Sequence, residues 1–354
     1  MKIYEHKLYQ EDLEAVCDLD LQWEKFQNSS IMISGATGLI GSFLVDVMMQ
    51  KNLANHLNCK VYALGRHERK ARERFDHYYG LTHFRFVACD VNEPLQIEDI
   101  SGIDYVVHLA SNTHPVAYAT DPIGTITTNI FGLKNMLDFS VDHQVKRFAF
   151  ASSCEIYGEN RGDVEKFDES YCGYIDCNTM RAGYPEGKRC GEALCQAYIV
   201  QKDMDIVIPR FARSYGPTLL KSDTKAMTQF LQKAVNEEDI VLKSEGMQDY
   251  SYTYMADAVS GLFTVLLRGK CGEAYNIADE KSDIHLRDLA GIIAKSVHRK
   301  VIFELPDQIE SAGYSKATKA RLDSTKIETL GWKARYDIHQ GIRRTIEILG
   351  QCEK

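Results

Sequence analysis

A short apolar strand followed by three glycines at three-residue spacing restricts the fold of this 354-residue chain more than any other feature. Residues 31–34 form the strand, Gly35, Gly38 and Gly41 follow, and residues 42–50 continue as a helical run. Gly35 and Gly38 would let the backbone approach a pyrophosphate at the helix N-terminus, and Gly41 would let the helix pack closely on the strand. The pattern predicts a dinucleotide-binding unit, with a glycine-rich turn that binds no ligand as the alternative.

Further strand-like segments indicate the class of fold. They lie at residues 61–64, 84–91, 105–110 and 147–151, with helical segments between most of them. Alternating strands and helices build a doubly wound parallel sheet, which binds ligands beyond the carboxyl ends of its strands. We therefore expect an α/β protein with a Rossmann-type parallel sheet and a smaller mixed α/β cap that binds the substrate.

The chain is long enough for a cofactor domain and a cap. We expect a helical extension at residues 1–29, the Rossmann domain at 30–208, and mainly the cap at 209–354, with segments that return to the sheet. The extension is expected to pack on the sheet or on a neighbouring subunit.

Tyr184 and Lys188 stand four residues apart, which places them on one face of a helix. An ammonium beside a phenol favours the ionised form of the phenol, so that tyrosine becomes a usable base for chemistry at an alcohol or ketone. The spacing alone is not specific, because Tyr198 and Lys202 repeat it. Ser152 and Ser153 follow the strand at 147–151 and are expected to face the same crevice as Tyr184.

Together, the glycine turn, the SSxxxYG motif that begins at Ser152 and the YxxxK motif at Tyr184 resemble the extended short-chain dehydrogenase/reductase family of nucleotide-sugar epimerases, dehydratases and decarboxylases. The resemblance covers roughly residues 30–345 and continues in four later motifs, at residues 129–133, 210–217, 252–257 and 330–332. The stretch 181–189 most closely resembles the UDP-glucuronate decarboxylases. The Tyr198 and Lys202 pair matches nothing in the family pattern.

The resemblance implies a catalytic set and a reaction. Tyr184, Lys188 and Ser153 would oxidise a sugar hydroxyl at C4, and Glu155 would then act at C5 or on a carboxylate of the 4-keto intermediate. Cys154 stands where the sugar dehydratases have an aspartate, and its thiol could donate a proton to a leaving hydroxyl. We expect a lyase, either a decarboxylase or a dehydratase. The alternatives are a C4 or C5 epimerase, an NADPH-dependent ketone reductase and a non-catalytic dinucleotide-sensing scaffold.

The expected substrate contacts are Thr113, Arg210, Arg213 and Tyr250, and two of them depart from the family pattern. Tyr250 stands where an arginine commonly contacts the diphosphate or a substrate carboxylate, and Arg213 stands where an asparagine is usual. Arg213 could pair with a phosphate or carboxylate. The positive charge that the family has at the position of Tyr250 would then lie at position 213 in this chain. The sugar and the nucleotide are left open, with a UDP-sugar favoured.

The resemblance also implies an NAD(P) site. Its expected residues are Gly35, Thr37, Gly38, Leu39, Ile40, Gly41, Arg66, Asp90, Val91, Leu109, Ala110, Ser111, Asn129, Ser152, Tyr184 and Lys188. The second strand ends at Gly65 and Arg66, where NAD-binding members have an acidic residue, so charge favours NADP and NAD stays open.

Composition restricts the remaining possibilities. A net charge of −8 gives no support for nucleic-acid binding, and no segment is apolar enough for a membrane helix, so a cytoplasmic enzyme is expected. The ten cysteines contain no CxxC motif, and no metal site is expected. By resemblance, the chain would form a homodimer through the helices that carry Asn129 and Tyr184.

Overall fold

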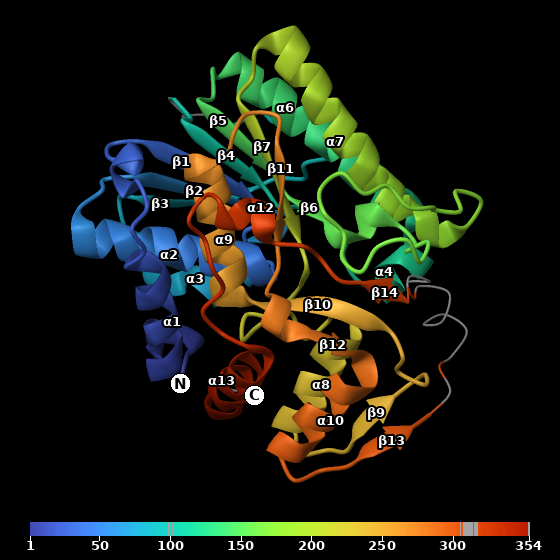
Figure 1. Cartoon of the computed structure of the whole chain (residues 1–354). Coiled ribbons are helices and arrows are strands. Elements are labelled where there is room, and N and C mark those ends of the chain that lie inside the picture. Colours follow the sequence, from blue (N-terminus) through green and yellow to red (C-terminus); the bar gives the residue numbers. More distant parts are fainter. Residues whose placement is uncertain (98–99, 101, 305, 307–313, 315–317, 353–354) are drawn as a thin grey trace.

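The main sheet of the computed structural model has eight strands, all parallel, in the order β11-β7-β5-β4-β1-β2-β3, with β6 beside β7 (Figure 1). The structure describes residues 1–97, 100, 102–304, 306, 314 and 318–352. The strands are β1 (Ser30–Ser34), β2 (Lys60–Gly65), β3 (Phe84–Ala88), β4 (Tyr105–His108), β5 (Arg147–Phe150), β6 (Ser152–Ser153), β7 (Ile206–Phe211) and β11 (Ala274–Ile277). Strand order reverses between β1 and β4, and such a switch point is where doubly wound sheets bind ligands.

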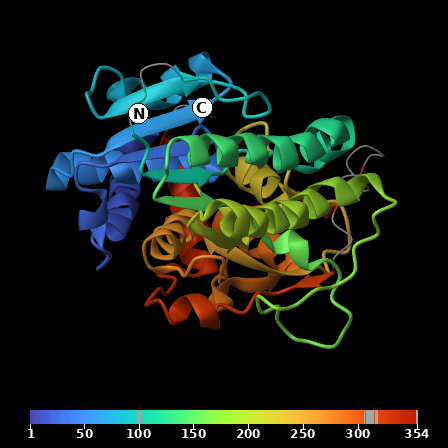
Figure 2. The same cartoon turned by 90° about the horizontal axis from the view of Figure 1, so that it is seen from above.

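Helices cover both faces of this sheet, which explains why strands such as β1 and β4 are buried along their whole length. One face carries α2 (Leu39–Asn55), α3 (Glu68–Phe75) and α9 (Met255–Arg268). The other carries α6 (Leu133–Asp142) and α7 (Gly183–Lys202), which lie side by side (Figure 2). A separate hydrophobic cluster fills the space on each face. Within the described ranges, no helix is long and apolar enough to cross a membrane.

A smaller mixed unit lies beyond the carboxyl ends of the main strands. Its central strand β10 (Asp249–Tyr254) is antiparallel to β12 (Asp283–His285) and parallel to β8 (Arg213–Tyr215) and β14 (Lys319–Ala320). The unit also contains β9 (Ile240–Leu242), β13 (Val301–Phe303), α8 (Ala226–Val235), α10 (Leu286–Ser296) and α13 (Ile338–Gln351). The predicted fold class is confirmed.

Short helices connect these elements. They are η1 (Ile3–Glu5), η2 (Trp23–Phe26), η3 (Asp76–Tyr78), α4 (Pro115–Thr120), α5 (Pro122–Thr127), η4 (Thr128–Gly132), η5 (Cys154–Tyr157), η6 (Met180–Ala182), η7 (Glu280–Ser282) and α12 (Thr325–Glu328). Both α9 and β11 come from the part of the sequence expected to be mainly cap, yet they belong to the main sheet layer. The expected domain boundaries stay a prediction, and the last of them, at 354, lies outside the described residues.

The N-terminal helix α1 (Lys7–Cys17) joins the two units through buried charges. Asp12 accepts hydrogen bonds from Arg344 Nε on α13, at 2.9 Å, and from the Tyr254 hydroxyl on β10, at 2.5 Å. One turn earlier, the Tyr9 hydroxyl donates to Asp46 on α2, at 2.5 Å, and Arg74 on α3 also pairs with Asp46. The extension is therefore part of the folded core.

Replacing Asp12 by alanine should lower the free energy of unfolding by about 3 kcal/mol, because Arg344 would lose its partner in a largely buried site. Urea denaturation of the two proteins measures the difference. Lys7→Ala is the matched control on the same helix: the Lys7 side chain is 89% exposed in its pair with Glu11, so its loss should cost ~0.5 kcal/mol or less. Equal losses in the two variants would contradict the assignment.

Candidate active site

A large cavity opens between the carboxyl ends of the main strands and the smaller unit. Its volume is about 1120 Å³, large enough for a dinucleotide together with a second ligand. Its walls come from the glycine turn, the ends of β2 to β6, the start of α7 and the smaller unit, including the loop at residues 217–225. The topology therefore brings residues far apart in sequence to one site.

The glycine turn has the shape predicted for a pyrophosphate cradle. Gly35 has a φ of +68°, and a Cβ there would come within 2.9 Å of the Ala110 nitrogen. A Cβ on Gly41 would lie 2.4 Å from the Gly35 oxygen, so α2 can approach β1 only if this residue is glycine. The remaining cavity-wall residues of the turn and the start of α2 are Thr37, Gly38, Leu39 and Ile40. These residues fit an NAD(P) pyrophosphate at the start of a long helix.

At the adenosine end of the expected site, Arg66, His67 and Lys70 line the cavity after β2, and Asp90 and Val91 line it after β3. The residues that follow β4, Leu109, Ala110 and Ser111, form the adjoining wall.

Asn129 differs from the expectation. Its side chain is buried behind the wall, where Nδ2 donates to the Thr125 oxygen at 2.7 Å and Oδ1 accepts from Ser111 Oγ at 3.0 Å. Asn129 therefore positions Ser111 and does not line the cavity itself.

The predicted oxidising residues meet in the cavity wall. Ser153 caps the short helix η5, accepting from the Glu155 backbone nitrogen at 3.2 Å. Tyr184 lies in the first turn of α7 and is buried. Burial raises the pKa of Tyr184, the nearby charge of Glu155 raises it further, and a hydrogen bond with Ser153 lowers it in part.

The Lys188 side chain makes a hydrogen bond to the backbone that follows β5. Its ammonium donates to the Ala151 oxygen at 2.8 Å and lies 6.0 Å from the centre of the Tyr184 ring. Burial lowers the pKa of Lys188 to about 7. Burial is the largest influence on the pKa of both groups in this geometry, and the role of Lys188 toward the Tyr184 phenol stays a prediction.

Glu155 is ion-paired with Arg181, a residue to which the sequence analysis gave no role. The two side chains are 19% and 10% exposed, so the pair is largely buried. Burial acts to raise the pKa of Glu155, but Arg181, followed by Arg213, outweighs burial and holds that pKa below its ordinary value. Glu155 is therefore a carboxylate in this geometry, and two guanidinium groups lie near it.

Tyr118 on α4 is a second residue that sequence reasoning missed. Its ring lies 4.6 Å from the Arg181 guanidinium and 5.1 Å from the Tyr184 ring. Tyr118 thus connects the arginine that binds Glu155 with the expected catalytic tyrosine. No sequence motif marks Tyr118, since only the folded position of α4 brings it here.

Arg213 and Cys154 lie beside this pair. Arg213 Nη1 is 3.7 Å from Cys154 Sγ, and its guanidinium stacks on Tyr250 at 3.4 Å from the ring centre. Burial raises the pKa of Cys154, which keeps the thiol protonated. Thr113 also lines the cavity and accepts from Lys225 Nζ at 3.3 Å.

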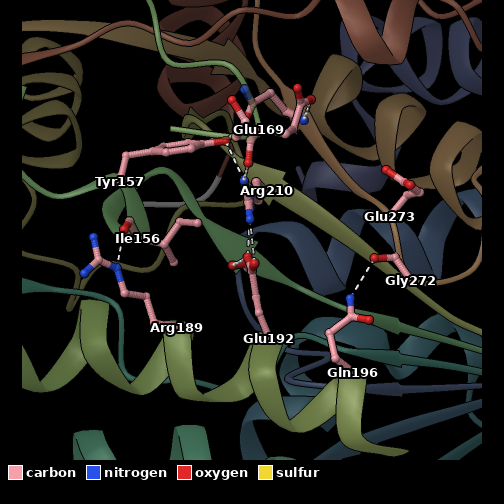
Figure 3. A network of polar contacts seen from close by, with 12 residues as sticks. Ile156, Tyr157, Glu169, Arg189, Glu192, Gln196, Arg210, Gly272 and Glu273 are labelled. Carbon is pink, nitrogen blue, oxygen red and sulfur yellow. Dashed lines mark hydrogen bonds and ion pairs between the residues drawn. The ribbon is translucent and has the colours of Figure 1, made fainter. Parts of the chain in front are cut away.

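Arg210, an expected substrate contact, makes several hydrogen bonds within the protein. Its guanidinium makes two bonds to the Glu192 carboxylate, at 2.9 and 2.6 Å, and others to the Tyr157 hydroxyl and the Glu169 oxygen (Figure 3). It is not among the residues that line the cavity. Glu192 also accepts from Ser152, so this network supports the cavity wall from behind.

The repeated spacing at Tyr198 and Lys202 has a structural explanation. The Tyr198 hydroxyl donates to Asp138, which joins α7 to α6. Tyr198 does not line the cavity.

Comparison with known proteins identifies the family. Residues 31–278 match the model of the NAD dependent epimerase/dehydratase family. The chain belongs to this family. It is 30% identical over 318 residues to UDP-glucuronic acid decarboxylase 3 of Arabidopsis thaliana, covering 89% of this chain and 87% of that protein. It is 27% identical over 325 residues to UDP-glucuronic acid decarboxylase 1 of Danio rerio, covering 91% and 72%. The predicted family and its closest local motifs are confirmed.

Solved structures of family enzymes share the fold. DesIV, a dTDP-glucose 4,6-dehydratase from Streptomyces venezuelae with NAD and TYD bound, superposes with a TM-score of 0.78 at 23% identity, covering 90% of this chain and 96% of that chain. UDP-glucuronic acid 4-epimerase from Bacillus cereus, in complex with UDP-glucuronic acid and NAD, gives a TM-score of 0.76 at 20% identity, covering 91% and 99%.

The buried Lys188 predicts a measurable pH dependence. Its pKa falls from an ordinary 10.5 to about 7 in the folded chain, so between these values the unfolded chain binds a proton that the folded chain has lost. Stability should therefore rise with pH from 7 toward 10, and Lys188→Met should remove much of this rise. Urea denaturation at several pH values tests this, with Lys202→Met at the exposed end of the same helix as control. The same pH dependence in the wild type and Lys188→Met would contradict it.

Proposed function

We propose that this chain is an NAD(P)-dependent lyase that oxidises a nucleotide sugar at C4 and then removes carbon dioxide from the 4-keto intermediate. UDP-glucuronate is the favoured substrate, because the relatives that match most of the chain are named UDP-glucuronic acid decarboxylases. The observation that carries the proposal is the carboxylate of Glu155 in the same cavity wall as Ser153 and Tyr184. A plain C4 epimerase needs no such carboxylate.

In the oxidation step, Tyr184 takes the proton of the C4 hydroxyl and Ser153 hydrogen-bonds the same oxygen. A bound NAD(P) supplies the acceptor for the hydride that leaves C4. Because burial raises the pKa of Tyr184, the phenol loses its proton only when a compensating positive charge is present. Lys188 can supply part of this charge, since with a pKa near 7 it gains or loses a proton at little cost.

After oxidation, the C4 ketone accepts the electron pair that remains on C5. In a hexuronate this pair comes from the bond to the departing carboxylate, and the resulting enolate then needs a proton at C5. In a neutral hexose, Glu155 would instead remove the C5 proton, and the protonated Cys154 thiol could donate to a leaving 6-hydroxyl. Dehydration is therefore the second candidate reaction. The observation that favours it is the buried thiol of Cys154, whose raised pKa keeps it protonated.

The cofactor preference is proposed from charge. Arg66, His67 and Lys70 line the adenosine end of the cavity after β2, and a guanidinium there suits a 2′-phosphate. NADP is thus slightly favoured over NAD, although the family description names NAD.

We also propose a homodimer. The helices α5, η4 and α7 expose apolar side chains, with Ile123 at 76%, Phe131 at 55% and Val200 at 83% exposure. A second copy would cover them in a symmetric helical interface. The cytoplasmic location stays a prediction.

Incubation of the purified protein with UDP-glucuronate, UDP-N-acetylglucosamine or dTDP-glucose, with NAD or NADP, tests the proposal by mass spectrometry. Loss of carbon dioxide is the expected result, and loss of water would favour the dehydratase. Tyr184→Phe should lower turnover by about 10² or more, within the range that general acid–base catalysis contributes. Tyr198→Phe, on the same helix, is the matched control. An unchanged mass with a new chromatographic peak would contradict the lyase and favour an epimerase.

Arg213 is expected to bind an anionic group of the substrate. Within the described ranges no carboxylate lies within ion-pair distance of Arg213, whose guanidinium contacts the Cys154 thiol and the Tyr250 ring. Arg213→Met should raise KM by about tenfold or more, since a hydrogen bond to a charged group contributes ~2 kcal/mol, and Arg213→Lys should recover part of this. Steady-state kinetics measure both, with the more exposed Arg299→Met as control. An unchanged KM would exclude the contact.

A further inference from the structure

A second, smaller cavity lies behind Glu155. It has a volume of about 70 Å³ and is lined by a different part of the chain, the loop between η5 and η6. Four residues line both this rear chamber and the large cavity: Cys154, Glu155, Arg181 and Arg213. The Glu155–Arg181 ion pair therefore stands between the two spaces, with the substrate site on one side and the rear chamber on the other.

The rear chamber is suited to water. A water molecule takes about 30 Å³ of liquid volume and needs two to four polar partners, so the chamber has room for about two. Arg181 Nε is buried and has no hydrogen-bond partner among the described residues, and the Arg181 side chain is 10% exposed. Glu155 and Thr179 add oxygen atoms to the same walls. A water bound to Arg181 Nε would supply the missing partner.

The chamber reaches the protein surface. Its outer rim is formed by Glu159 and Tyr174, which are exposed, and the Glu159 nitrogen donates to the Tyr174 oxygen at 2.9 Å. Asp176, partly exposed, adds a further carboxylate. Polar groups thus extend from the inner wall at Glu155 to solvent.

We propose that the rear chamber is a water-filled proton path that connects Glu155 with solvent while substrate fills the large cavity. This inference rests on the proposed function. When decarboxylation leaves the electron pair of the broken bond on C5 as an enolate, a proton from solvent passes through a chamber water to the Glu155 carboxylate and from Glu155 to C5, which leaves Glu155 ionised again. When the C5 proton is removed instead, Glu155 takes it and the same water carries it away.

The charges around Glu155 suit a transient proton carrier. Arg181 and Arg213 favour its ionised form, so a proton gained from the chamber passes on readily to a basic carbon. In the large cavity, a bound sugar would itself block the access of solvent to Glu155. A path through the rear chamber would let Glu155 exchange protons with solvent while the intermediate stays enclosed.

The test fills the chamber without touching the substrate wall. Ile175 lines only the rear chamber and comes from the loop, so Ile175→Trp should displace its water. Thr179→Val is nearly isosteric and removes the hydroxyl together with its 2.9 Å hydrogen bond to the Asp176 backbone oxygen, so it changes the chamber without adding bulk. Ile302→Trp in β13 is the control, because Ile302 is 41% exposed and lines neither cavity.

Reactions run in D2O with UDP-glucuronate separate the two half-reactions. Absorbance of the reduced cofactor follows C4 oxidation, and mass spectrometry follows deuterium entering C5 of the product. We expect Ile175→Trp to leave oxidation unchanged and slow deuterium entry by about tenfold or more, and Thr179→Val to act in the same direction.

Three results would contradict either the proposed proton path or the proposed function on which it rests. Wild-type rates of deuterium entry in both variants would contradict the path. An equal loss in both half-reactions would also contradict it, because it would mean that the substitutions disturb the substrate site. If the wild type converts no nucleotide sugar, the proposed function fails first, and this outcome is distinct from a failure of the path.

Discussion

The buried ion pair between Glu155 and Arg181 organises the chemical end of this molecule. It joins η5, which follows the main sheet, to η6, which leads into the α7 helix that carries Tyr184 and Lys188. Arg181 also packs on Tyr118, whose ring contacts Tyr184. Removing one partner of such a pair leaves an uncompensated charge in a poorly solvated site, so the pair holds η5 and η6 together.

Buried arginines in this fold have different roles, and their partners distinguish them. Arg210 has its charge matched by both oxygens of Glu192 and serves as a support behind the cavity. Arg181 is matched by Glu155, but one of its nitrogens has no hydrogen-bond partner within the described part of the chain. Arg213 rests on an aromatic ring beside a thiol, which leaves its charge available for a ligand. The same residue type therefore stabilises, positions or binds, according to the charge that faces it.

The fold and half of the site could be predicted from the sequence because they rest on local patterns. The glycine turn predicted the cradle because only glycine permits the approach of α2 to β1, and the two short motifs located Ser153, Glu155, Tyr184 and Lys188. Arg181 was visible in the sequence but gained a role only when η6 brought it to Glu155. The partners of Arg210 could not be predicted, because nothing local shows that Glu192, on the helix that precedes β7, pairs with it. The direction of the Tyr184 pKa depends on burial, which no spacing reveals.

The central claim is that Glu155 acts after C4 oxidation. A single-turnover reaction of Glu155→Gln with UDP-glucuronate tests it most directly, with reduced cofactor followed by absorbance and carbon dioxide release measured in parallel. We predict that oxidation proceeds and reduced cofactor accumulates, while formation of the protonated product slows by about 10² or more. Loss of oxidation together with the later step, or an unchanged rate for both, would contradict it.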